Sequence, residues 1–389
     1  MSGNRRPVLI LTAGYGEGHN SAARALQAAF REEQDVDATL VDIFADYAPR
    51  MNDWSRKAYL RIINRAPGLW GGCYRWLDRS RSVPRLFQLL AGQARLLAKR
   101  IEEERPVALC CTYPVYPWLL QQIRRRETIP PVFTIVTDAL TINSLWFRAP
   151  SRRWYVTDEG SAEVMVQGGV LPGKIEVSGF PVGLAFADRP AGLPPPQENS
   201  ARRRVLFMVN SGRAAAGATV RAILERTDCA LTVTAGRDLR LQRQLEGMAP
   251  AFPDRLQVLG WTDRIPELLM SHHLVISKAG GATTQEAINA LCPMIVSQVV
   301  PGQEEGNWEL LRRNAAGVRA DTPDEICTII RRAFAEEGVL WQSWRRQLAV
   351  IARPQAARTI ARSVLARVEA RPGSVTANLR FGNLKVAGS

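Results

Sequence analysis

Ser277–Ala287, with the sequence SKAGGATTQEA, is the most informative stretch of this chain. An apolar run at 274–276 leads into the glycine pair Gly280-Gly281, and a helix-forming segment follows. This order places backbone N–H groups and the positive end of a helix dipole where a phosphate can bind. Glu286 lies three residues past Thr283, about one turn into the helix. From there its carboxylate can reach a ribose hydroxyl beside that phosphate.

A second informative segment, Pro301–Asn307, reads PGQEEGN and lies one βα unit further along. Its amide and carboxylate side chains suit the hydroxyl groups of a sugar. The two segments together predict a nucleotide-sugar site, against the simpler alternative of a plain βα turn with a threonine cap. The donor contacts predicted here are Gly280, Gly281, Ala282, Thr283, Glu286, Gln303, Glu304 and Asn307.

Strand-like and helix-like stretches alternate on both sides of a proline-rich segment at 187–203. Repeated βα units predict parallel sheets with helices on both faces. We therefore expect an α/β protein in which two Rossmann-like domains face each other across a cleft. The expected boundaries are a first domain at 1–186, a linker at 187–203, a second domain at 204–352, a helix at 353–371 that returns to the first domain, and a loose tail at 372–389.

The bulk composition is that of a folded protein with two domains. The chain has 389 residues, of which 46% are hydrophobic and 23% are charged. It has no apolar run of the roughly 18 residues that a transmembrane helix needs, and the run at 8–11 is too short for a secretory signal. We expect a cytoplasmic protein. The six cysteines have no C-x-x-C spacing, so we expect buried thiols and neither a metal site nor a tightly bound cofactor.

The net charge of +14 is unevenly distributed. Basic residues clearly outnumber acidic ones between 50 and 105, and aromatic residues lie among them. This mixture suits an anionic membrane surface or a nucleic acid, and solvated helix faces are the simpler alternative. No nucleic-acid motif is present, so we expect none as a partner. The predicted membrane and acceptor residues are Trp54, Arg56, Lys57, Arg61, Arg65, Trp70 and Trp76.

The first glycine-rich loop, at 12–20, ends in a histidine that could act as a base. Its glycines depart from the G-x-G-x-x-G spacing, so the match to a dinucleotide fingerprint is weak. His19 stands at the entrance of the following helix, where its ring would project into the cleft and stay neutral. Asp138, at the end of another strand, could orient His19, hold the acceptor or be the base itself. Helix capping is the alternative for both residues.

Three weaker signals complete the predicted donor site. Gly18 precedes the histidine, and two short polar loops follow strands of the second domain. Such loops are common after strands, so each signal says little alone. The residues concerned are Gly18, Asn210, Ser211, Gly212, Gly260, Trp261 and Thr262.

Four motifs together resemble the family-28 glycosyltransferases of the two-domain GT-B type. They are the loop at 16–20, Thr137-Asp138, the stretch at 179–182, and the pair formed by 280–287 and 301–307. The resemblance is nearest to the monogalactosyldiacylglycerol synthase and processive diacylglycerol glucosyltransferase group. Ala279 stands where this group commonly has proline, and Asn143 lies where it often has histidine.

The resemblance implies an inverting transfer of a hexose from a UDP-sugar to a lipid hydroxyl, with diacylglycerol as the expected acceptor. UDP-sugar would be a co-substrate, His19 or Asp138 the base, and Glu286 the ribose ligand. The first domain would rest on the inner face of the cell membrane as a peripheral protein. Two alternatives remain: a UDP-sugar epimerase or hydrolase of the same architecture, and a non-catalytic binder of acidic surfaces.

Overall fold

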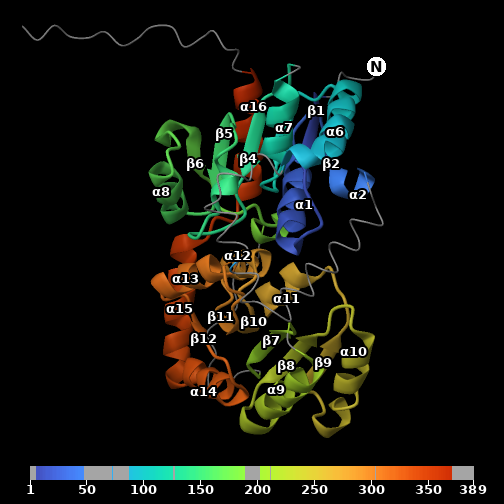
Figure 1. Ribbon diagram of the computed structural model, residues 1–389. Helices are drawn as coiled ribbons and strands as arrows, with labels where there is room; N and C mark the ends of the chain where they lie inside the picture. Colours follow the sequence, from blue (N-terminus) through green and yellow to red (C-terminus); the bar gives the residue numbers. More distant parts are fainter. Residues whose placement is uncertain are drawn as a thin grey trace, which may run out of the picture.

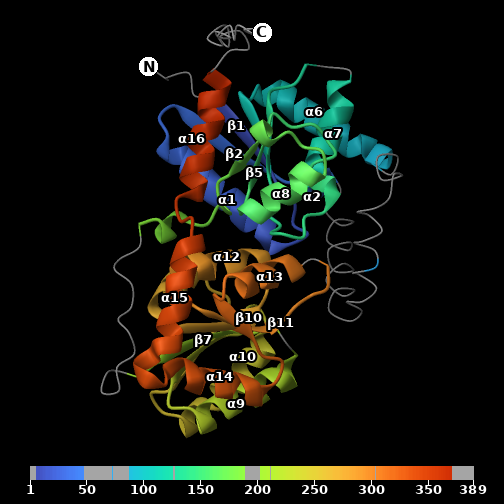
Figure 2. The same ribbon diagram turned by 90° about the vertical axis from the view of Figure 1, so that its left-hand side faces the viewer.

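The computed structural model describes residues 6–47, 72, 87–125, 128–188, 202–210, 212–302 and 304–369. They form two α/β halves stacked one above the other (Figure 1). Figure 2 shows the two halves after a quarter turn, with helices packed around the strands of each half. The expected pair of Rossmann-like parallel-sheet domains is therefore confirmed.

The N-terminal half contains a six-stranded parallel sheet of order β2-β1-β3-β4-β5-β6. Its strands are β1 (Arg6–Leu11), β2 (Val36–Val41), β3 (Ala108–Cys111), β4 (Val132–Ile135), β5 (Arg153–Val156) and β6 (Ile175–Val177). Its helices are α1 (Glu17–Glu32), α2 (Ile43–Tyr47), α6 (Ala91–Glu104), α7 (Tyr116–Arg124), α8 (Glu159–Gln167) and the C-terminal α16 (Ala356–Glu369).

Successive residues of β1 explain why both faces of this sheet are covered. Side chains alternate between the faces of a strand. Val8 and Ile10 pack with α1 and α16 on one face. Leu9 and Leu11 pack with α6 and α7 on the other. An unbroken apolar run is thus what a strand with helices on both sides requires.

The C-terminal half repeats the design, with strand order β12-β11-β10-β7-β8-β9. Its strands are β7 (Arg204–Met208), β8 (Ala230–Thr234), β9 (Leu256–Leu259), β10 (Leu274–Lys278), β11 (Met294–Gln298) and β12 (Gly317–Arg319). Its helices are α9 (Arg213–Arg226), α10 (Leu239–Glu246), α11 (Ile265–Ser271), α12 (Gly281–Ala290), α13 (Glu305–Arg313), α14 (Pro323–Phe334) and α15 (Val339–Ile351). Short 3-10 turns occupy Phe87–Leu90, Ser144–Trp146, Pro172–Lys174, Leu184–Phe186, Ala249–Ala251 and Glu336–Gly338.

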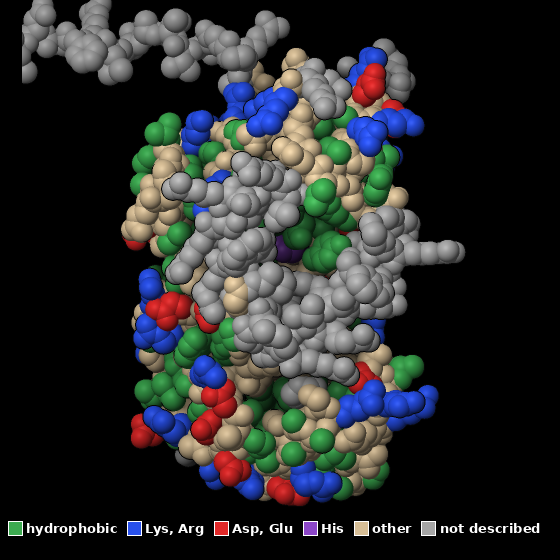
Figure 3. Space-filling view, in the orientation of Figure 1, with side chains coloured by type: hydrophobic (Ala, Val, Ile, Leu, Met, Phe, Trp, Pro, Cys, Tyr) green, Lys and Arg blue, Asp and Glu red, His purple; other side chains and the backbone are tan. Residues whose placement is uncertain are grey.

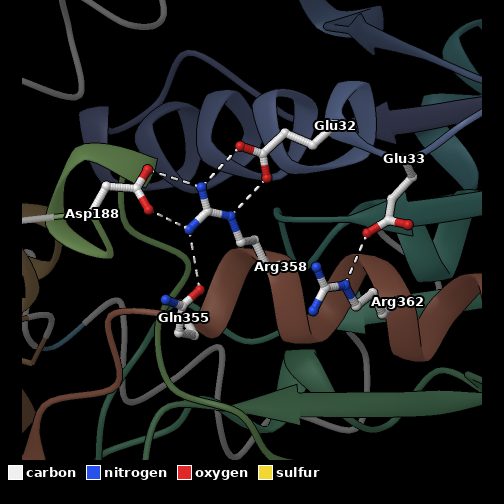
Figure 4. Close-up of polar contacts among 6 residues, drawn as sticks. All are labelled: Glu32, Glu33, Asp188, Gln355, Arg358 and Arg362. Carbon is white, nitrogen blue, oxygen red and sulfur yellow. Dashed lines mark hydrogen bonds and ion pairs between the residues drawn. The ribbon is translucent and has the colours of Figure 1, made fainter.

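The C-terminal helix α16 lies against α1 in the N-terminal half, although it follows α15 of the other half (Figure 2). Ile360 and Val364 are fully buried in that contact. Figure 4 shows the polar part: the Arg358 guanidinium donates to both oxygens of Glu32 at 2.7 and 2.9 Å and to both oxygens of Asp188 at 2.9 Å. Arg362 pairs with Glu33 one turn later. The chain therefore returns to the first half beside the point where it left it.

The two halves share one apolar cluster, in which Phe180 and Phe186 pack with residues of the C-terminal half, and their backbones also come close at three glycines. A β-carbon on Gly18 would lie 3.7 Å from the Ala282 nitrogen, and one on Gly281 would lie 3.7 Å from the Thr137 carbonyl oxygen. Gly306 is tighter still, because its β-carbon would lie 1.8 Å from the Ala139 carbonyl oxygen. Glycine is thus needed at position 306 to let α13 approach the N-terminal half.

Gly306→Ala is expected to force these halves apart. The added methyl group overlaps a backbone oxygen, so the loop at 139–141 or the start of α13 must shift. We expect a loss of about 1–3 kcal/mol in the free energy of unfolding and a reduced turnover, measured by thermal unfolding and an activity assay. Gly173→Ala is the control, since no atom lies within 4 Å of its β-carbon position. Equal stability of the two variants would contradict this view of the interface.

Candidate active site between the two halves

The strand orders locate the site. In open parallel sheets, ligands bind beyond the carboxyl ends of the strands, where the strand order reverses direction. These points lie between β1 and β3 in one half and between β7 and β10 in the other. The loops at 12–16 and 279–280 follow β1 and β10 and lead into α1 and α12, which contact each other. The site is therefore formed where the first turns of two helices meet.

The first turn of α12 has the features of an anion site. The helix begins at Gly281, and the preceding Gly280 is extended, with φ −67° and ψ 139°. No side chain caps this end, and the first N–H groups of any helix have no partner within the helix. With the helix dipole, these N–H groups suit a diphosphate. Gly280, Gly281, Ala282 and Thr283 lie together on this turn as the sequence indicated.

His19 lies in the first turn of α1 and faces the cleft from the N-terminal half. Its Nδ1 is 2.9 Å from Thr137 Oγ1. Its ring packs edge-on against Tyr113, with centroids 5.1 Å apart, and lies 6.0 Å from Trp146. Figure 3 shows a histidine side chain set among hydrophobic ones where the surface is hollowed between the halves. The surroundings of His19 are thus mostly aromatic.

Burial is the main reason that the pKa of His19 is low. Desolvation lowers it from 6.5 to about 4, and the backbone of Thr112 partly opposes this shift. The positive end of the helix dipole also favours a low pKa for a histidine at this position. The largest cause is the loss of water around the ring. The imidazole is therefore neutral near pH 7 and can accept a proton.

Asp138 is bonded to Trp146, whose ring also lies near His19. Its Oδ2 accepts a hydrogen bond from Trp146 Nε1 at 2.8 Å, and its backbone oxygen lies 3.5 Å from Thr157 Oγ1. The hydrogen bond on the imidazole of His19 comes from Thr137 instead. Sequence reasoning noted Thr137 only as part of a motif and gave it no role, because a contact between residues 118 positions apart has no local signal.

Thr137→Val should reveal what this hydroxyl does. Valine has a similar shape but cannot form a hydrogen bond to the imidazole. We therefore expect about a tenfold loss of kcat, less than the hundredfold or more that loss of the whole general base would cost. The pH profile of kcat should also change, because the hydroxyl influences the proton on the ring. Thr137→Ser keeps the bond and should retain most of the activity. If valine and serine variants had the same rate, the contact would have no catalytic role.

Glu286 projects from the second turn of α12 toward α1. Its Oε1 accepts a hydrogen bond from Ser21 Oγ at 3.2 Å. Burial raises the pKa of this carboxyl from 4.5 to about 7, while the Ser21 bond and Arg24 lower it and Glu17 raises it. The carboxylate thus lies one turn beyond the glycine turn at 280–281, as we expect of a ribose ligand. It is bonded to Ser21 of the opposite half.

Two of the predicted sugar contacts, Glu304 and Asn307, are hydrogen-bonded to other residues of the C-terminal half. Glu304 is 4% exposed, pairs with Lys278 Nζ and accepts from the Val300 amide at 3.0 Å. Asn307 Nδ2 donates to the Ala279 carbonyl at 3.0 Å, whereas its Oδ1 is buried without a hydrogen-bond partner. Gln303 lies outside the described residues. Lys278, which sequence reasoning passed over, thus fixes the carboxylate of Glu304 beside the glycine turn.

The other residues predicted to contact the sugar donor lie around the carboxyl ends of β7 and β9. Asn210 Nδ2 donates to Ser277 Oγ at 2.9 Å, and Gly212 caps α9. Trp261 is 63% exposed, and the Arg237 guanidinium lies 5.5 Å from its ring centroid. Thr262 Oγ1 accepts from the Arg264 amide, and Gly260 adjoins Gln242. Ser211 lies outside the described residues.

The predicted membrane residues, Trp54, Arg56, Lys57, Arg61, Arg65, Trp70 and Trp76, all lie outside the described residues. Within the described ranges, no helix is long and apolar enough to cross a membrane. The same ranges hold no cluster of three or more residues suited to a metal ion. The pair His272-His273 is buried and bonded to Leu268, Thr232 and Arg204 of the protein itself.

Two facing Rossmann-like halves with a glycine-rich anion turn at the cleft define the GT-B class of fold. Solved structures agree. The chain superposes on Medicago truncatula UGT71G1 complexed with UDP-glucose with a TM-score of 0.59, at 10% identity, covering 92% of this chain and 98% of that one. It superposes on the UDP-GlcNAc 2-epimerase of Neisseria meningitidis bound to UDP-GlcNAc with a TM-score of 0.56, at 13% identity, covering 92% and 100%. The fold alone thus does not separate transferases from epimerases.

Sequence similarity favours the transferases over the epimerases. Residues 19–182 match the family described as Monogalactosyldiacylglycerol (MGDG) synthase. The chain is also 25% identical over 378 residues to the processive diacylglycerol beta-glucosyltransferase of Bacillus cereus strain AH820, covering 95% of each chain. The resemblance indicated by the motifs is confirmed, and the chain is a glycosyltransferase of the GT-B type.

Proposed function

We propose that the protein is an inverting transferase that moves a hexose from a UDP-sugar to the hydroxyl of a membrane lipid, with diacylglycerol as the acceptor. One observation carries the proposal: the neutral His19 and the uncapped first turn of α12 lie on two helices that contact each other, where a β-carbon on Gly18 would lie 3.7 Å from the Ala282 nitrogen. A base and a leaving-group site on opposite sides of a sugar are what inversion requires. The names of the sequence relatives support the lipid acceptor.

In this proposal the C-terminal half binds the donor. The N–H groups at 281–283 hold the diphosphate, Glu286 holds the ribose, and Trp261 and Asn210 border the nucleotide. Glu304 and Asn307 face the sugar, and the unpaired Oδ1 of Asn307 is an acceptor suited to a sugar hydroxyl. The helix dipole and amides stabilise the negative charge that develops on the departing diphosphate. We expect no tightly bound cofactor in this chemistry.

Donor binding would also make the base stronger. An imidazole with a pKa of about 4 is a weak proton acceptor near pH 7. A diphosphate brings negative charge close to the ring, and negative charge stabilises the imidazolium and raises its pKa. His19 would therefore gain basicity when the leaving group is in place. It would then take the acceptor proton as the hydroxyl oxygen attacks the anomeric carbon from the face opposite UDP.

We assign the acceptor to the N-terminal half, where Tyr15, Phe44 and Tyr113 form contacting aromatic rings beside His19. Such rings exclude water and suit an apolar molecule that carries a hydroxyl. The basic aromatic segment at 50–105 would attach this half to the inner face of the cell membrane. We regard the protein as peripheral and cytoplasmic, and we expect no nucleic acid as a partner.

The test is a panel of radiolabelled UDP-hexoses, each incubated with and without diacylglycerol vesicles and followed by chromatography of the lipid products. We expect labelled glycolipid with one donor, and only when diacylglycerol is present. Release of UDP or an epimerised donor without any glycolipid would favour the epimerase or hydrolase alternative, which the shared fold makes relevant. Salt-sensitive binding to acidic surfaces with no effect of UDP would favour a non-catalytic binder.

A further inference from the structure

The first turns of α1 and α12 lie close together, and the helices contact each other. The Ala282 nitrogen, which the proposed function assigns to the diphosphate, lies 3.7 Å from where a β-carbon on Gly18 would be. A phosphate oxygen needs to come within about 3 Å of that nitrogen, and the rest of the phosphate needs further room. A diphosphate on this turn would thus lie directly beside α1, and we expect α1 and α12 to move apart when the donor enters.

One side-chain hydrogen bond joins the two helices there. Ser21 Oγ donates to Glu286 Oε1 at 3.2 Å, between residues 265 positions apart in the sequence and on opposite halves of the protein. Glu286 is also the group that the proposed function assigns to the ribose. A ribose hydroxyl and the Ser21 hydroxyl are both donors for the same carboxylate oxygens, so they compete.

We propose that the Ser21–Glu286 hydrogen bond is a latch that keeps the ligand-free cleft closed, and that donor binding exchanges it for a bond to the ribose. This inference rests on the proposed function in its assignment of Glu286 to the donor. Ser21 is then a positioning residue, which acts on the donor only through Glu286. The latch favours the closed cleft until a nucleotide takes over the carboxylate.

The charges around Glu286 agree with an exchangeable contact. Arg24 and Glu17, both on α1, face the same carboxyl and act in opposite directions on its pKa, and they also pair with each other. Ser21 lowers the pKa of Glu286, so it favours the ionised form that a ribose also needs. A hydroxyl is thus a partner that keeps the carboxylate ready without adding a charge that the nucleotide would have to displace.

Ser21→Ala is expected to tighten UDP binding about threefold to tenfold, because a closed state that no longer has this bond competes less with the donor. Removing the hydroxyl should also move the pH midpoint of UDP binding upward. Ser21→Thr keeps a hydroxyl and should behave as the wild type. Isothermal titration calorimetry with UDP, from pH 6 to pH 8, measures both effects.

Ser363→Ala is the matched control. Ser363 Oγ donates to Glu176 Oε2 at 2.9 Å, which is also a serine–carboxylate bond, but it lies between α16 and β6 and away from the cleft. Its removal should leave UDP affinity unchanged. A folded Ser21→Ala protein that binds UDP as weakly as the wild type, or more weakly, overturns the latch while the proposed function stands.

Hydrogen exchange tests the latch without any donor. Amides in the first turns of α1 and α12 should exchange faster in Ser21→Ala than in the wild type and in Ser363→Ala, because the closed state is less populated. Unchanged exchange would refute the latch. A wild-type protein that binds no UDP or UDP-hexose refutes the proposed donor instead, and the exchange experiment still decides whether Ser21 holds the cleft closed.

Discussion

Replacing His19 by alanine is expected to lower kcat about a hundredfold to ten-thousandfold and to leave the affinity for UDP nearly unchanged. The range is that of general-base catalysis. Affinity should persist because the donor contacts lie on α12 and the loops of the other half. Steady-state transfer to diacylglycerol gives kcat, and calorimetry gives the dissociation constant of UDP. Because the pKa of His19 is about 4, its titration should have no effect on the free enzyme between pH 6 and pH 8.

Asp138→Asn separates the two candidate bases. The structure bonds the Asp138 carboxylate to the indole of Trp146, and an asparagine oxygen can accept the same hydrogen bond. If Asp138 mainly holds Trp146, the asparagine variant should lose less than about tenfold in kcat. If its carboxylate is the base, it should lose as much as His19→Ala was expected to lose. Full activity of His19→Ala would eliminate the histidine from the mechanism.

Glu286→Gln is the second change for which we expect a large effect, and its sign depends on what is measured. A carboxylate accepts hydrogen bonds from both ribose hydroxyls, and it is ionised only above its pKa of about 7. UDP affinity of the wild type should therefore rise as the pH rises from 6 to 8. The glutamine variant should bind UDP at least tenfold more weakly at pH 8, by the size of charge-assisted hydrogen bonds.

The control for this pH dependence is the ratio of the UDP dissociation constants of the wild type and of Glu286→Gln, compared at each pH. The terminal phosphate of UDP also titrates near pH 6, and this affects both proteins equally. Only the part that differs between wild type and Glu286→Gln belongs to the carboxyl group. A ratio that is constant from pH 6 to pH 8 would show that Glu286 does not take part in donor binding.

The same substitution should stabilise the ligand-free protein. The pKa of Glu286 is raised in the folded state from 4.5 to about 7, so the folded protein holds a proton that the unfolded chain releases between these values. Stability therefore falls as the pH rises through this window, and the loss is complete above pH 7. Glutamine cannot ionise, so the variant should be more stable at pH 8 by about 1–3 kcal/mol. Thermal unfolding at pH 5 and pH 8 distinguishes this from a pH-independent effect.

Much of the fold could be predicted because its signals are local. Apolar runs such as 8–11 and 274–276, each followed by a glycine-rich turn, indicate buried parallel strands. All six strands of each sheet are parallel, as the βα alternation requires. The short strand β12 was not predicted, because Gly317–Arg319 is too brief to give a pattern.

The candidate site could be predicted only where one loop supplies several groups. The turn at 280–283 and Glu286 lie within a few residues, so spacing alone brought them together. Thr137 beside His19 and Ser21 beside Glu286 had no such signal, because each contact joins distant parts of the chain. The role of Asp138 as the partner of His19 was one of several hypotheses and stays a prediction, whereas the contact of Thr137 with the His19 ring was not foreseen.

Local patterns in the sequence were enough to predict two βα halves with a phosphate-binding turn in the second. Strand periodicity and the placement of glycines are set by residues that lie within a few positions of each other. Only the tertiary structure decided which groups meet across the cleft. Ser21 bonds to Glu286, and Gly306 presses against Ala139, because α1 and the loop after β4 pack onto α12 and α13. Such contacts depend on how two complete domains close on each other, and no local pattern encodes that geometry.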